Sequence, residues 1–359
     1  PYYVGDINRP GLFQSWLARK YDHNVEMLNK SYSSAFSSFD EVQPPRKKPE
    51  HYTELPRFFD WFRFKEYTVL EFLGRLRESM VAKGIDVPFY LNDPFLLTEL
   101  ITCVKDVPKY FEGKKPPLII GPDLYPCISN IETVWKIPLH RSVQKQGPIV
   151  GYEVDPIYSV DPKELDILYR LMIALGLDGF CYYMLVGGHT PAGYTAWTGD
   201  AYEPGAAIGP EGRVGETYSV FKKFGELLST HGTNLSKAKT EIELTLAIYH
   251  PYTVCGSSCG DTSHIGFIEN VFRSFEYFFV GGLVPLLIKS GIAFDVIDIE
   301  DARLEELLEH RVLWVMSMDF MDAQTQRKLA NYVKGGGTLI LHPITPYLDT
   351  EMRLSLIHI

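Results

Sequence analysis

Between residues 60 and 230, short apolar runs alternate with longer segments in which apolar side chains recur every three to four positions. Short apolar runs are typical of buried strands, and the three-to-four spacing is typical of helices with one buried face. The alternation therefore predicts successive βα units around a parallel sheet. The first helix is predicted over residues 60–83 and ends at Gly84.

Four strands are predicted in this region, over residues 87–91, 118–121, 148–152 and 180–185. Carboxylates, tyrosine, tryptophan and histidine gather after them: Asn92 and Asp93, Asp123 and Tyr125, Glu153, and Gly187-Gly188-His189. Exposed βα loops are polar in any protein, but catalytic groups gather at these strand ends in (β/α)8 barrels. We predict an α/β fold in which residues 1–237 form the C-terminal half of a TIM barrel, strands 5–8.

A second unit is predicted over residues 238–350. Its strands fall at 242–248, 294–297, 312–316 and 338–341, and its helices at 265–290, 302–309 and 323–334. This alternation indicates a flavodoxin-like, glutamine-amidotransferase-like α/β domain. The triplet Gly335-Gly336-Gly337 follows a helix and precedes a strand, the reverse of a phosphate-binding loop, so we interpret it as a helix stop.

Two further segments bear on the organisation of the chain. The apolar run 275–287 is either an interface or a buried helix, and burial is favoured because helices of such sheets bury one face. Residues 354–359 resemble translated adapter sequence and are left out of the fold prediction. The start at Pro1 resembles the middle of a loop, so we expect a fragment whose first four barrel strands lie upstream.

Composition narrows the function. The 359 residues are 45% hydrophobic and 22% charged, without a long uninterrupted apolar run, which indicates a soluble globular protein and no membrane span. A net charge of -10 without a basic stripe argues against nucleic-acid binding.

The five cysteines give no sign of a metal site or a disulfide framework. Cys255 and Cys259 are close in sequence, but no further ligand lies at zinc-binding spacing. The apolar settings of Cys103 and Cys181 predict buried thiols. The cysteines do not determine the cellular compartment of the protein, and a cytoplasmic location is slightly favoured over secretion.

Glu153 is the leading candidate for chemistry. It ends the strand Gly147-Pro148-Ile149-Val150-Gly151-Tyr152-Glu153 and precedes the irregular stretch Val154-Asp155-Pro156-Ile157-Tyr158. A carboxylate at a strand end, followed by aromatic residues and proline, is a candidate for catalysis on a sugar substrate. Alone, such a residue is also explained by capping the next helix or facing solvent.

Several segments resemble glycoside hydrolases. The first fifty residues resemble the stretch after the acid/base strand of family 42 and family 35 β-galactosidases, through Phe13-Gln14-Ser15-Trp16-Leu17, Tyr21, Leu28-Asn29, Tyr32, Phe36, Ser38-Phe39, Glu41-Val42 and Pro44-Pro45. The strand ending at Glu153 is similar to the family 35 nucleophile strand. Four further segments resemble the eighth strand of family 35 and the loop that follows it: Tyr182-Tyr183-Met184, Gly187-Gly188-His189-Thr190, Tyr202-Glu203-Pro204-Gly205-Ala206 and Gly212. From Glu241 onward the chain is similar to the family 42 trimerisation domain.

The resemblance implies a retaining exo-glycosidase that removes terminal β-D-galactosyl residues, with Glu153 as nucleophile. Such enzymes use two carboxyl groups about 5 to 5.5 Å apart and need no cofactor. Tyr182 or Tyr183 is the expected donor to Glu153, and strand alternation lets only one of them face the barrel interior. The family's acid/base follows an asparagine, and no Asn-Glu pair occurs in the first fifty residues. We therefore expect this chain alone to lack glycosidase activity.

Other strand-end residues are candidates for contacts to the sugar: Asn92, Asp93, Asp123, Tyr125, Asp155, Tyr158, Tyr182, Tyr183, His189 and Trp197. Trp197 either stacks on the sugar or packs on the barrel rim. The chain departs from the families at two points. Gly187-Gly188-His189-Thr190 stands where family 35 has Gly-Gly-Thr-Asn, and the family 42 cysteine cluster is not visible.

The leading prediction names partners, and two alternatives stay open beside it. The expected partners are a β-galactoside or related oligosaccharide and further copies of the chain, as a trimer through the second unit. An exo-β-D-glucosaminidase is the enzymatic alternative, for which Asp155 or Asp123 could contact the amino group. A sugar-binding or assembly protein that keeps the scaffold without catalysis is the alternative from another class.

Overall fold

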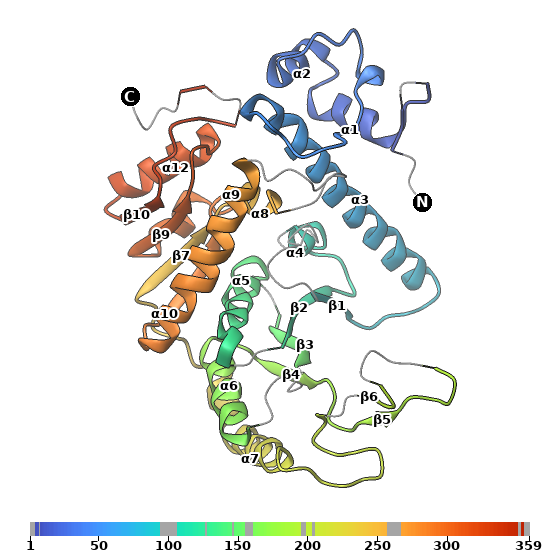
Figure 1. Cartoon of the computed structure of the whole chain (residues 1–359), viewed down its shortest axis with the longest axis vertical. Helices are drawn as coiled ribbons and strands as arrows, with labels where there is room; N and C mark the ends of the chain where they lie inside the picture. Colours follow the sequence, from blue (N-terminus) through green and yellow to red (C-terminus); the bar gives the residue numbers. More distant parts are fainter. Residues whose placement is uncertain are drawn as a thin grey trace.

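The computed structural model of the chain describes residues 4–6, 8–93, 106–125, 128–145, 147–154, 161–194, 199–202, 205–256, 267–350 and 353–354. Figure 1 shows an N-terminal helical segment and two α/β units, with the long helix α3 running between the helical segment and both units. The predicted boundary at residues 237 and 238 falls in the connection between α7 and β7.

The N-terminal segment contains α1 (Leu12–Lys20), α2 (Val25–Tyr32) and α3 (Leu55–Ala82), with short 3-10 turns at Phe39–Glu41 and Tyr52–Glu54. Helix α3 confirms the helix predicted over 60–83 and begins earlier, because Pro56 fits a first helical turn. Its buried Asp60 accepts hydrogen bonds from the hydroxyls of Tyr21 and Tyr32, both at 2.8 Å, and pairs with Lys20. These contacts fasten α1 and α2 to α3.

The first unit is a four-stranded parallel sheet in the order β1-β2-β3-β4. Its strands are β1 (Phe89–Asp93), β2 (Leu118–Leu124), β3 (Val150–Val154) and β4 (Gly179–Tyr182). The helical segments around it are α4 (Val107–Tyr110), the 3-10 segment η4 (Ile128–Trp135), α5 (Lys136–Val143), α6 (Pro162–Ala174) and α7 (Tyr218–Leu235). A separate antiparallel pair joins β5 (Gly188–His189) to β6 (Ala201–Tyr202). Sequential parallel neighbours are what consecutive βα units of a barrel produce.

Helices cover one face of this sheet, and part of the other face is exposed in the described part of the chain. One face packs against α6 and α7 through Val154, Tyr169 and Phe224. On the other face Tyr90 is 58% exposed and the Cys181 thiol is free and exposed. The predicted burial of Cys181 is wrong, because strand alternation turns it away from Phe180 and Tyr182, which pack towards the helices. Cys255 is a buried free thiol, and Cys103, Cys127 and Cys259 lie outside the described residues.

The second unit is a parallel sheet in the order β10-β9-β7-β8. Its strands are β7 (Leu244–Ile248), β8 (Phe294–Asp298), β9 (Val312–Ser317) and β10 (Thr338–Pro343). Its helices are α8 (His250–Val254), α9 (Phe267–Arg273), α10 (Val284–Lys289), α11 (Leu304–Leu308) and α12 (Ala323–Lys334). This strand order is the flavodoxin-like arrangement. The α/β fold predicted for the chain is thus confirmed.

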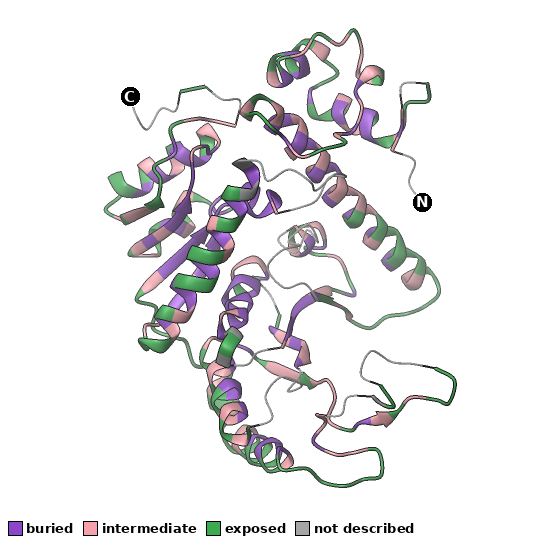
Figure 2. Cartoon of the chain, viewed as in Figure 1, coloured by how far each residue is buried: buried purple, intermediate pink, exposed green. Residues whose placement is uncertain are grey.

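Helices α9 and α10 join through a π-helical segment, Ser274–Leu283. One face of the joined helix is buried, through Phe275, Phe279, Val280, Leu283, Val284 and Leu287. The other presents Tyr277, Phe278 and Leu286, which are 63%, 63% and 60% exposed (Figure 2). The stretch Asn270–Lys289 is, by length and composition, apolar enough to cross a membrane, and 44% of its most apolar 18-residue window is buried within the fold.

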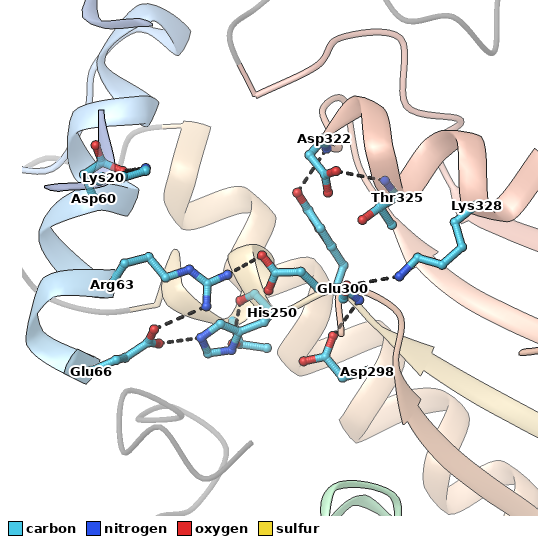
Figure 3. Close-up of polar contacts among 12 residues, drawn as sticks. Lys20, Asp60, Arg63, Glu66, His250, Asp298, Glu300, Asp322, Thr325 and Lys328 are labelled. Carbon is cyan, nitrogen blue, oxygen red and sulfur yellow. Dashed lines mark hydrogen bonds and ion pairs between the residues drawn. The ribbon is translucent and has the colours of Figure 1, made fainter. Parts of the chain in front are cut away.

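The core of the second unit continues onto α3. Leu55, Phe58 and Phe62 of α3 belong to the same buried cluster as the strands β7 to β9. Polar contacts reinforce this junction (Figure 3): Glu66 accepts from Nε2 of His250 at 2.5 Å, and Arg63 contacts both Glu66 and Glu300. Helix α3 therefore packs against the second unit, and its Leu70 also lies in a buried cluster with Ile120 of β2 in the first unit.

Candidate active site at the strand ends

Four of the predicted residues meet at the C-terminal ends of β1, β2 and β3. The register of β2 and β3 places Asp123 directly opposite Glu153. The amide Nδ2 of Asn92 donates to Asp123 Oδ2 at 3.0 Å and to Glu153 Oε1 at 3.4 Å. The Tyr125 hydroxyl donates to the other oxygen, Oε2, of Glu153. Both carboxylate oxygens of Glu153 therefore accept a hydrogen bond.

A bulge in β3 explains why Glu153 faces this group. Between the pairs Gly151↔Phe180 and Val154↔Tyr182, two residues of β3 oppose one residue of β4. Such a bulge re-aims side chains, because the strict alternation of faces is interrupted. Tyr152 packs edge-on against the ring of Tyr90, and the next residue, Glu153, still reaches Asn92. Without the bulge these neighbours would point to opposite faces.

Asp123 is the buried carboxyl group beside Glu153, and its pKa is raised. It is 1% exposed, and its Oδ1 has no hydrogen-bond partner among the described residues. Burial and the neighbouring Glu153 raise the pKa of Asp123 to about 6, against the opposing hydrogen bond from Asn92. Perturbed carboxyls in pairs are typical of catalytic sites.

A second set of polar groups lies between these strand ends and α5. Asp93 is 5% exposed and its Oδ2 is 3.4 Å from Nε2 of the fully buried His140. Nδ1 of His140 lies 2.8 Å from the Lys136 carbonyl, which can only accept, so Nδ1 carries the proton of that bond. Burial lowers the pKa of His140, while Asp93 opposes that change. Asp93 thus contacts the helix layer.

The remaining predicted residues lie elsewhere. Tyr182 packs against Tyr169 and Phe221 in the helix-covered core. The hydroxyl of Tyr183 contacts that of Tyr202. His189 is exposed on β5, with Nε2 2.7 Å from Oε1 of Glu211. Asp155, Tyr158 and Trp197 lie outside the described residues. The roles suggested for these residues stay predictions.

The structure also shows contacts that the sequence did not predict. The tyrosine that donates to Glu153 is Tyr125, because the paired register of β2 and β3 brings it there. Lys136 and His140 were missed altogether, although their spacing of four in an apolar helix puts them on one face. No group of three or more His, Cys, Asp or Glu side chains able to hold a metal ion occurs in the described ranges.

Comparisons with known proteins agree with this arrangement. The family model of glycoside hydrolase family 42, described as beta-galactosidase, matches residues 6–185, half of the chain. A second model, described as GLMA-like, second domain, matches residues 262–357. A crystal structure of beta-galactosidase from Bacillus circulans sp. alkalophilus has a TM-score of 0.69 to this chain at 18% identity, over 96% of this chain and 50% of that one. At that identity the likeness shows the fold alone.

Two curated relatives are exo-beta-D-glucosaminidases. The one from Pyrococcus horikoshii is 29% identical over an alignment of 361 positions, which covers 97% of this chain and 45% of that protein. The one from Thermococcus kodakarensis is 28% identical over an alignment of 361 positions, which covers 97% of this chain and 44% of that protein. The chain spans about half the length of the curated relatives it matches. From the match over residues 6–185 and the shared fold, the chain belongs to glycoside hydrolase family 42.

Proposed function

We propose that the protein is a retaining exo-glycosidase that cleaves a terminal, non-reducing β-linked hexose, with Glu153 as nucleophile. The observation that carries the proposal is the pair of hydrogen bonds from Tyr125 and Asn92 to the two oxygens of Glu153. These donors hold the carboxyl group in place and fix the direction of its lone pairs. The bulged strand end holds the group towards the open face of the sheet.

The chemistry proceeds by double displacement. A carboxylate oxygen of Glu153 attacks the anomeric carbon, and the bond from that carbon to the leaving oxygen breaks as this oxygen takes a proton from a second carboxyl group. A glycosyl ester on Glu153 forms. Water then attacks the same carbon, the second carboxyl group accepts its proton, and Glu153 is released. We assign the second carboxyl group to no residue of this chain.

For the sugar, we favour a β-D-glucosaminide. Asp123 lies beside Glu153 and shares Asn92 with it, so a charged amino group on the sugar would meet a second carboxylate close to the nucleophile. Two relatives that match 97% of this chain are exo-beta-D-glucosaminidases. A β-D-galactoside is the second candidate, supported by the description of the family model.

Glycosides of 2,4-dinitrophenol test the proposal in this chain, because dinitrophenolate leaves without being protonated and transfer to Glu153 then needs no acid residue. The chain is mixed with the β-D-glucosaminide or the β-D-galactoside. Dinitrophenolate release is followed by absorbance, and the labelled peptide is identified by mass spectrometry. We expect release and a glycosyl ester on Glu153, faster with the glucosaminide.

Two variants complete this experiment. Glu153→Gln should abolish both release and label, whereas Glu226→Gln, an exposed glutamate on α7, should leave them unchanged. Faster transfer from the galactoside would reverse the sugar preference. Calorimetric binding of either sugar without any transfer to Glu153 would instead support a sugar-binding protein on this scaffold and exclude the enzyme.

We also propose self-association, as a trimer, through the second unit. The exposed residues Phe278 and Leu286 belong to the lining of a hollow of about 210 Å³, formed by Phe278, Phe279, Gly282, Leu283, Leu286, Trp314, Met316, His342 and Pro343. Apolar patches of this kind are often covered in oligomers. Sedimentation equilibrium should give a trimer that Phe278→Asp dissociates. Phe72→Asp, at an exposed phenylalanine of α3, should leave it intact, and a monomeric parent would contradict the proposal.

A further inference from the structure

Lys136 is a buried ammonium group behind the strand ends. It is the first residue of α5, which packs on β2, and it is 4% exposed. Among the described residues its Nζ has no hydrogen-bond partner. Burying an ammonium group in this way is unfavourable, and an apolar side chain of similar length would fill the same space at lower cost. A purely structural role is therefore better served by methionine.

The charges around Lys136 suggest what it does. Lys136 interacts electrostatically with Asp93 and Asp123. Glu153 of β3 and Asp93 of β1 both act on Asp123 in the direction of protonation, as burial does. His140, the other basic group of α5 in this cluster, faces Asp93 and is fully buried. Of the side chains that act on Asp123, Lys136 is the cation that favours its carboxylate form.

Asn92 links the protonation state of Asp123 to Glu153. Nδ2 of Asn92 donates to Oδ2 of Asp123 and to Oε1 of Glu153, so the two carboxyl groups share one donor. An ionised Asp123 accepts the hydrogen bond from the Asn92 amide and adds negative charge beside Glu153. A protonated Asp123 would be neutral there and would offer no attraction to a cationic sugar.

We propose that Lys136 is a positioning residue that keeps Asp123 as a carboxylate beside Glu153 and thereby makes the site prefer a β-glycoside with an ammonium group over a neutral one. This inference rests on the proposed function, since it assigns the sugar preference of the same site. Lys136 itself touches no reacting atom. Its influence passes through the charge of Asp123 and the orientation of Asn92.

Two substitutions separate charge from packing. Lys136→Met keeps the length of the side chain and removes its charge, while Lys136→Arg keeps the charge. Lys109→Met, at an exposed lysine of α4, is the matched control. The first readout needs no catalysis: a ¹³C NMR titration of aspartate carboxyl groups, with the Asp123 signal assigned from its loss in Asp123→Asn. The second readout is the ratio of dinitrophenolate release from the β-glucosaminide and the β-galactoside at pH 7.

We expect Lys136→Met to raise the titration midpoint of Asp123 by about one to two pH units from about 6, and so to lower the preference for the glucosaminide at pH 7 by about two- to tenfold. Lys136→Arg should restore both, and Lys109→Met should change neither. An unchanged midpoint in a folded Lys136→Met protein would overturn the inference. So would a raised midpoint with an unchanged sugar preference. Failure of the parent chain itself to transfer either sugar to Glu153 would instead overturn the proposed function.

Discussion

At the scale of single residues, the site at the strand ends contains Asp123, a buried carboxyl group whose ionisation is unfavourable in the folded chain. Asp123 is 1% exposed and its pKa is raised to about 6, above the usual 3.8, first by burial and then by Glu153. Between these two pH values the folded chain binds more protons at this site than the unfolded chain does. Stability contributed by this residue is thus full below pH 3.8 and is lost as the pH rises through 6.

Asp123→Asn should therefore stabilise the chain at neutral pH. The amide oxygen can still accept from Asn92, while the buried charge is gone. From the size of the shift we expect a gain in the free energy of unfolding of about 3 kcal/mol at pH 7 and almost none below pH 4. Urea denaturation at several pH values measures it.

Asp86→Asn, at an exposed aspartate between α3 and β1, serves as the control and should change the free energy of unfolding by less than about 0.5 kcal/mol at any pH. A destabilised Asp123→Asn variant at pH 7 would show that the charge of Asp123 is well compensated in the folded state. Lost preference for the glucosaminide in the stabilised variant would agree with the function proposed for this carboxylate.

At the scale of elements, the site depends on how closely β2 and β3 approach each other. A methyl group built on Gly121 would lie 2.0 Å from the backbone oxygen of Val150 and 2.6 Å from the ring of Tyr152. Glycine is thus required in β2 by the neighbouring backbone. This close contact supports the register that sets Asp123 opposite Glu153, two residues further along.

We expect Gly121→Ala to push the two strands apart, lower the free energy of unfolding by about 1 to 3 kcal/mol, and reduce sugar transfer to Glu153. Gly225→Ala in α7 is the matched control, because nothing lies within 4 Å of the added methyl group. As an alanine in a helix interior, it should stabilise the chain by up to about 1 kcal/mol. Chemical denaturation of both variants distinguishes them, and equal effects would contradict the packing argument.

At the scale of the whole molecule, α3 joins the two units by both apolar and polar contacts. Its residues Leu55, Phe58 and Phe62 enter the core of the second unit. Glu66, which is 2% exposed, contacts Nε2 of His250 at the C-terminal end of β7. That edge of a flavodoxin-like sheet commonly binds ligands, and here α3 contacts it (Figure 3).

Glu66→Ala should be strongly destabilising, because it leaves Arg63 and His250 with less compensation in a buried junction. We expect a loss of about 3 kcal/mol in the free energy of unfolding. The matched control is Lys47→Ala, which removes a surface pair with Glu50 whose side chains are 56% and 48% exposed, and should leave the free energy of unfolding almost unchanged. Urea denaturation measures both, and a cost no larger than that of the control would show that the apolar contacts alone hold the units together.

The sequence by itself determined the elements and their order. Helix Ala323–Lys334 was predicted with the bounds that the structure has, and the strands fell within a few residues of those observed. Periodicity is a local property, so apolar spacing of 2 or of 3.6 residues is readable without knowing what the face packs against. The resemblance to family 42 was readable in the same way, from residues close together in the chain.

Tertiary structure alone decided which side chains meet. The bulge in β3 and the register with β2 bring Tyr125, rather than Tyr182 or Tyr183, to Glu153. The packing of α5 on β2 places the buried charge of Lys136 behind Asp123. Strand alternation within a sheet that helices cover on one face leaves Cys181 exposed despite its apolar neighbours. Each of these outcomes depends on pairing between segments distant in sequence, and the local pattern of apolar and polar residues carries no information about that pairing.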